Sequence, residues 1–176
     1  MLIFNSRYDL IREEKEIIIY GVNRMDIDLD GLRRGSRKRY FEIWQKMKNN
    51  EPLEGEEAII GKVMLEHTEF HNTWEFADVL SDVEYNVGSE INPYLHVVVH
   101  TIIERQLALN KPKEVRFIYD ILRAEGIDRH SIIHKIGSVL LEEIISILQL
   151  NQQFSSAHYI NKLQSLVYHV RKNNHP

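Results

Sequence analysis

Three pairs of histidines stand four residues apart in this chain, and no other feature of the sequence is better suited to chemistry. Nine histidines placed at random over 176 residues would give only about 0.4 such pairs. Residues four apart share one face of an α-helix, where two imidazoles can converge on one cation. We therefore predict that a divalent metal is bound by the three pairs, which are His67/His71, His96/His100 and His130/His134. Within the first pair, His71 is either a further ligand or a partner of the ligands, because Thr68 and Asn72 indicate that the helix can end between His67 and His71.

The pairs also share the apolar faces of their predicted helices. Val99 and Ile103 follow the pair of one helix, and Ile133 and Leu141 accompany the pair of another, so both stripes should face a core. Buried imidazoles need partners for their nitrogens, and a cation meets that need because each neutral ring gives it a lone pair. A single histidine on such a face is usually an ordinary core residue, so the hypothesis depends on all three pairs together.

Two glutamates extend the predicted site. Glu104 lies four residues after His100, and Glu142 lies two turns after His134. We predict that Glu104 is a further ligand or a partner of the ligands, and that Glu104 or Glu142 moves the proton if the protein is an enzyme. Six histidines and a glutamate exceed the four ligands of a tetrahedral zinc, so one ion or two remain open. Imidazole and carboxylate ligands without thiolate suit Zn, Fe, Mn, Ni or Co.

The composition excludes several classes of protein. The chain has no cysteine, which removes disulfides, thiolate metal sites, iron–sulfur clusters and cysteine nucleophiles. Its net charge of −4 argues against a general binder of nucleic acid. No apolar run approaches the roughly 20 residues of a membrane helix, and residues 1–10 do not have the pattern of a signal peptide. We therefore expect a soluble cytoplasmic protein, and the sequence is compatible with a homo-oligomer.

Helical signals dominate from Ser36 onward and predict a mainly α protein, a bundle of five or six helices over residues 36–176. Asn92-Pro93 is typical of a helix start, Asp128 can cap another helix, and Gly126 can end the one before it. The apolar patterns predict helices at about 36–49, 52–71, 92–109, 111–124, 128–148 and 155–171, with a loop over 72–91. Residues 1–35 are predicted to form an N-terminal arm with a short strand at 16–20.

The segment Asn92-Pro93-Tyr94-Leu95-His96, followed by His100, resembles the signature of a bacterial family recorded as a domain of unknown function. Further stretches match it in order: Arg39–Trp44, Glu51-Pro52-Leu53, His67–His71, and Ile118-Tyr119 ahead of His130 and His134. The resemblance covers about residues 36–143. It implies that the three pairs belong to one recurring pattern, and it carries no established activity.

Bundles of the hemerythrin and DinB kinds are similar in placing histidines from several helices around one or two metals. The hemerythrin ligand spacings do not occur here in their order, so we do not predict oxygen carriage.

Three functions remain open on this basis. The first is a metal-binding protein with a hydrolase or oxidoreductase activity, acting on an unidentified small molecule. The second is a metal-sensing or structural scaffold without turnover. The third is a metal-free interaction module with a histidine-rich core. His158 and His169 are predicted to be surface residues, since the apolar positions of their helix occupy the opposite face.

Overall fold

The computed structural model describes residues 36–79, 92–150 and 153–174. These residues form seven α-helices and one short 3-10 helix, and no strand occurs among them, so the prediction of a mainly α fold is confirmed. None of the helices in these ranges is long and apolar enough to span a membrane. The described chain divides into two compact units, residues 36–104 and residues 105–174. The predicted arm over 1–35 lies outside the described residues, and a single domain over 36–176 stays a prediction.

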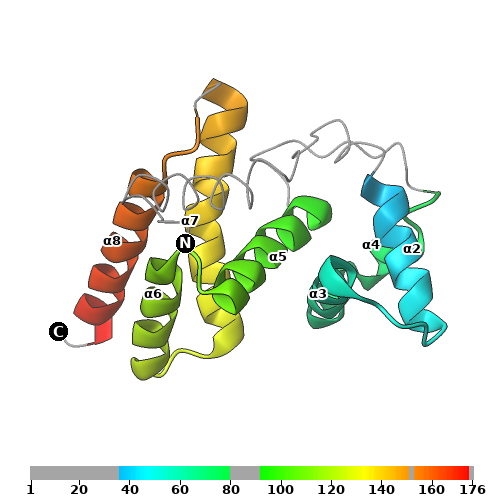
Figure 1. The fold of residues 1–176 in the computed structure, drawn as a ribbon, viewed down its shortest axis with the longest axis horizontal. Helices are drawn as coiled ribbons and strands as arrows, with labels where there is room; N and C mark the ends of the chain where they lie inside the picture. The colour runs from blue at the N-terminus through cyan, green and yellow to red at the C-terminus, as the bar shows by residue number, and fades with distance from the viewer. Residues whose placement is uncertain (1–35, 80–91, 151–152, 175–176) are drawn as a thin grey trace, which may run out of the picture. The chain divides into compact units, whose positions relative to one another are not determined.

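The N-terminal unit contains α2 (Ser36–Lys48), α3 (Gly55–Glu66), the 3-10 helix η2 (Thr68–Phe70), α4 (His71–Glu75) and the first three turns of α5 (Pro93–Leu109). Helix α2 packs against α3 and α4 (Figure 1). The 3-10 helix η2 follows α3 and precedes α4 in the chain, and it contacts both. The core of this unit is rich in aromatic and aliphatic side chains, which include Tyr40, Ile43, Trp44, Ile60, Val63, Met64, Trp74, Tyr94 and Val98.

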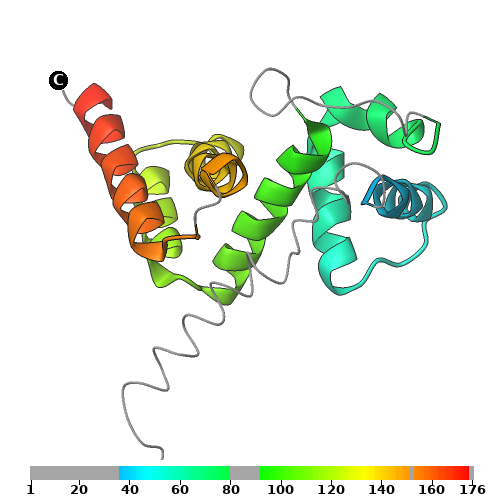
Figure 2. The same ribbon diagram turned by 90° about the horizontal axis from the view of Figure 1, so that it is seen from above.

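The C-terminal unit is a three-helix bundle of α6 (Lys113–Ala124), α7 (Arg129–Leu150) and α8 (Ser156–Asn174). Each of these helices packs against the other two, as Figures 1 and 2 show. Leu122, Ile136, Leu140 and Leu163 are fully buried in their shared core. Apolar residues at helical spacing thus place one face of each helix against the others.

Residues close in sequence fix three of the predicted helix ends, which are the starts of α5 and α7 and the end of α6. The Asn92 side chain accepts hydrogen bonds from the backbone of Tyr94 and Leu95 at 3.0 and 3.1 Å, which fixes the start of α5. Asp128 accepts one from the Ser131 backbone at 3.0 Å at the start of α7. Gly126 has a φ of +82° just after α6, a conformation in which glycine meets no steric penalty.

The prediction of one helix over 52–71 is wrong. Helix α3 ends at Glu66, and His67 leaves the helical region with φ −114° and ψ +73°. The chain then forms η2, and α4 continues to Glu75 within the segment predicted as a loop. This break allows Trp74 to lie fully buried, stacked on Tyr40 and edge-on to Tyr94. Tertiary burial of a large aromatic side chain therefore overrides the local helical pattern.

Candidate metal centre

Three of the predicted histidines converge in the N-terminal unit. His67 Nε2 lies 3.2 Å from His96 Nε2 and 3.3 Å from His100 Nδ1. One nitrogen of each ring lies within 4.8 Å of the other two. Helix α5 supplies His96 and His100 from successive turns, and the residue just after α3 supplies His67. The break after Glu66 thus places the third imidazole opposite the pair on α5.

The spacing of these nitrogens suits a bound metal ion. Two imidazole nitrogens on a tetrahedral zinc, each 2.0–2.1 Å from the ion, stand about 3.3 Å apart. The two distances from His67 Nε2, 3.2 and 3.3 Å, match that value. The side chains therefore fit a first-row divalent ion.

A carboxylate orients the central imidazole. His67 Nδ1 donates to Glu69 Oε1 over 2.9 Å, and the His67 side chain is only 1% exposed. Partial burial by itself raises the pKa of Glu69, but the hydrogen bonds from His67 and from the backbone lower it more, so the net shift is downward and the carboxylate is ionised near neutral pH. An ionised carboxylate accepts the Nδ1 proton and leaves His67 Nε2 with its lone pair facing the other two rings.

Hydrogen bonds among the three rings do not by themselves satisfy all the ring nitrogens that meet at His67 Nε2. With its Nδ1 proton directed to Glu69, neutral His67 has one lone pair on Nε2, and two ring nitrogens approach that atom. Two N–H donors would have to share that lone pair, which lies in the plane of the His67 ring. A cation resolves the conflict because each of the three rings can direct a lone pair towards it.

Aromatic side chains line one side of the cluster. The Phe70 ring stacks on His67 with centroids 5.9 Å apart and meets His96 edge-on at 5.4 Å. Behind it, Trp74 packs against Phe70 at 6.1 Å. His67 and His100 are 0% and 2% exposed, so the candidate site lies in a largely dry environment.

His71 and Glu104 have other contacts in this unit. The His71 ring packs on Trp44 with centroids 4.9 Å apart, and His71 is not among the histidines whose nitrogens converge. Because helix α3 ends at Glu66, His67 and His71 do not share one helical face, and the prediction of His71 as a ligand depended on that shared face. Glu104 Oε1 lies 3.7 Å from Lys62 Nζ, which is also 3.6 Å from Glu66. A role for His71 or Glu104 at a metal stays a prediction.

The third predicted pair lies on α7 in the C-terminal unit. His130 Nε2 and His134 Nε2 are 2.9 Å apart, and their ring centroids are separated by 4.4 Å. The four-residue spacing therefore brings these two rings together on one helix, as the sequence indicated. The prediction that this pair faces a core is wrong for His130, which is exposed. Their participation in metal binding stays a prediction.

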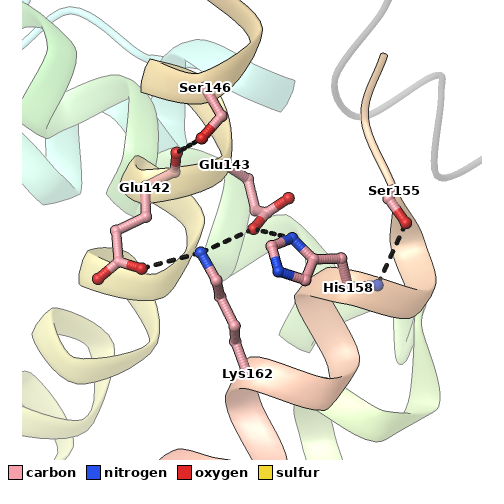
Figure 3. A network of polar contacts seen from close by, with 6 residues as sticks. All are labelled: Glu142, Glu143, Ser146, Ser155, His158 and Lys162. Atoms are coloured by element: carbon pink, nitrogen blue, oxygen red, sulfur yellow. Dashed lines mark hydrogen bonds and ion pairs between the residues drawn. The ribbon is translucent and has the colours of Figure 1, made fainter. Parts of the chain in front are cut away.

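The predicted proton-transfer group Glu142 belongs to a polar network between α7 and α8 (Figure 3). Lys162 Nζ lies 2.9 Å from Glu142 Oε2 and 3.1 Å from Oε1 of the buried Glu143. His158 Nδ1 lies 2.8 Å from the same Glu143 oxygen. His158 is exposed, as predicted, but its contact with a buried carboxylate was missed because only the helical face of His158 had been considered.

Glu69 is the residue of the candidate site that sequence reasoning missed. In a continuous helix, a side chain two residues after His67 would point to the opposite face. The helix break after Glu66 changes that direction and lets Glu69 reach back to the His67 ring. A carboxylate two residues from a ligand candidate was the available signal, and the wrong helix boundary hid it.

Comparison with known proteins adds a family but no activity. Residues 32–165 match the family described as Domain of unknown function (DUF1841), which confirms the resemblance to a family of that kind. No curated protein and no solved structure matches the chain.

Proposed function

Because the chain belongs to this family of unknown function, its role has to be argued from its own residues, and we propose that it binds a divalent transition metal through His67, His96 and His100. The observation that carries the proposal is the convergence of three imidazole nitrogens at 3.2 and 3.3 Å around His67 Nε2. Glu69 supports it by directing the His67 lone pair into the cluster.

The donor set limits which ion is bound. Neutral imidazoles suit Zn, Ni, Co, Fe or Mn, and affinity alone would rank nickel and zinc above manganese and iron. The three nitrogens converge on one point, so we propose one ion in the N-terminal unit. Such an ion would act as a Lewis acid, and the chain would supply its ligands, the orientation of His67 and an aromatic side that limits the access of water.

The metal content of untagged protein tests the proposal. After loading with Zn²⁺ and desalting, elemental analysis should find about one equivalent in the native chain, and His100→Gln should retain less than about a tenth of it. His169→Gln is the matched control, because the exposed His169 ring bonds the Ser165 carbonyl on α8. The same measurement on His130→Gln and His134→Gln tests the prediction made for the second pair.

Thermal unfolding gives an independent readout. An ion that binds only the folded chain, present at 1,000 times its dissociation constant, adds about 4 kcal/mol to the free energy of unfolding. Chelation should therefore lower the melting temperature by several degrees in the native protein and leave His100→Gln unchanged. Less than a tenth of an equivalent of metal in the native protein, with a melting temperature insensitive to chelator and to added metal, would contradict the proposal.

A further inference from the structure

The proposed centre would place a positive charge in a dry environment. Three neutral imidazoles leave a divalent ion with its full charge of +2, and the group of converging ligand atoms found in the described part of the chain contains histidines alone. His67 and His100 are almost fully buried, so surrounding water screens that charge weakly. A buried net charge is costly unless a charge of opposite sign accompanies it.

The carboxylates of the N-terminal unit that lie near the histidines are held by other groups. Glu69 contacts Nδ1 of His67, the ring nitrogen that does not converge, and so it acts on the ion only through the ring. Glu66 and Glu104 both lie within 4.0 Å of Lys62 Nζ. Part of the charge is thus offset through His67, and a direct anionic ligand would offset more of it.

The side chains around the cluster restrict the size of such a ligand. Phe70 covers the His67 and His96 rings on one side, and His67 and His100 are closed to solvent. His96 is partly exposed, so the cluster is not closed to solvent at all three rings. An aromatic wall and one partly exposed imidazole favour a small anion over a bulky one.

We propose that the ion held by His67, His96 and His100 takes a small exogenous monoanion as an additional ligand, through one oxygen or nitrogen donor. The inference rests on the proposed metal binding and names the class of ligand that the same site accepts. Simple carboxylates, hydroxide and azide belong to this class. One such anion reduces the charge of the complex from +2 to +1, and the Glu69 carboxylate, hydrogen-bonded to a ligand ring, offsets the remainder.

Cobalt substitution makes the anion visible. We would load the full chain with Co²⁺, record its visible d–d bands, and titrate sodium azide at constant ionic strength kept with perchlorate. The expected result is a saturable change that corresponds to one azide per cobalt and is absent without cobalt. If cobalt binds with the histidine dependence described above and its bands ignore azide, this inference is overturned and the metal site stands. If no cobalt binds, the proposed function itself fails.

The Glu69→Gln variant tests the charge argument separately. Removing the negative charge beside His67 should tighten azide binding to the cobalt form by about threefold or more, because less of the charge on the ion is then offset. Glu66→Gln is the matched control, since the Glu66 carboxylate lies 3.6 Å from the positively charged Lys62 Nζ, and the azide affinity of this variant should stay unchanged. An azide affinity in Glu69→Gln that is unchanged or weaker would refute charge compensation as the reason for anion binding.

Discussion

The contact between Glu69 and His67 gives the sharpest prediction. Replacing Glu69 with alanine removes the acceptor of the His67 Nδ1 proton, which lies 2.9 Å from the carboxylate. The ring can then carry its proton on Nε2 instead, and in that tautomer the lone pair no longer faces His96 and His100. Metal binding must restore the productive tautomer and its orientation, so the affinity for Zn²⁺ should fall.

The structure sets the size of this loss. Removing a residue that orients a metal ligand typically costs 10–100-fold in affinity, or about 1.4–2.7 kcal/mol. The Glu69 side chain is 56% exposed, so water can take its place at Nδ1 and the loss should lie near tenfold for Glu69→Ala. Glu69→Gln keeps an amide oxygen as a neutral acceptor. Because charge-assisted hydrogen bonds are about twice as strong as neutral ones, its loss should be about threefold.

Competition between the protein and a chromophoric chelator for Zn²⁺ at fixed pH measures both affinities. Glu66→Ala is the control, because its carboxylate lies 3.6 Å from Lys62 Nζ. We expect that variant to stay within about twofold of the native affinity. Native affinity in Glu69→Ala, or an equal loss in Glu66→Ala, would show that Glu69 does not orient a metal ligand.

Urea unfolding, followed by circular dichroism, tests three predictions about the helices that surround these residues. Asn92→Ala removes the cap of α5 and should cost about 1 kcal/mol; an unchanged midpoint would contradict that role. Gly61→Ala would place its Cβ only 2.6 Å from the Leu53 Cδ1 atom, and because that side chain is flexible the cost should be about 1 kcal/mol. Lys162→Met should cost about 1–2 kcal/mol at pH 7. The hydrogen bond to Glu142 raises the pKa of Lys162, so this contribution is present below the ordinary value of 10.5 and is lost as the pH rises above it. A Lys162→Met penalty as large at high pH as at pH 7 would refute the ion pair.

Much of the fold could be predicted because its signals are local. Asn92, Asp128 and Gly126 act through hydrogen bonds or backbone conformations that involve only the next few residues, and all three mark helix ends where expected. The apolar periodicity of the later helices likewise needs no knowledge of the partner helix. The pairing of His96 with His100 belongs to this class, since both rings project from successive turns of α5.

The errors lie where tertiary contacts decide the conformation. Residues 52–71 carry a helical pattern, yet the chain leaves the helix at His67 so that Trp74 can reach the core beside Tyr40 and Tyr94. Thr68 and Asn72 indicate that the helix can end before His71, but no neighbouring residue indicates that Trp74 is buried against Tyr40 and Tyr94. The assignment of His71 to a shared face with His67, and the omission of Glu69, both follow from this single error.

The position of His67 therefore depends on packing that lies outside the histidine cluster. His67 and Phe70 stack on each other, Phe70 packs on Trp74, and Trp74 is held by two aromatic side chains from α2 and α5. A substitution that loosens Trp74 must release the turn that carries His67, while His96 and His100 keep their places on a capped helix. The proposed ion would bridge α5 to this turn, so metal binding should stabilise the segment 67–75 more than α5. The residues that give the candidate centre its third ligand are thus the ones whose folding the ion would most strongly support.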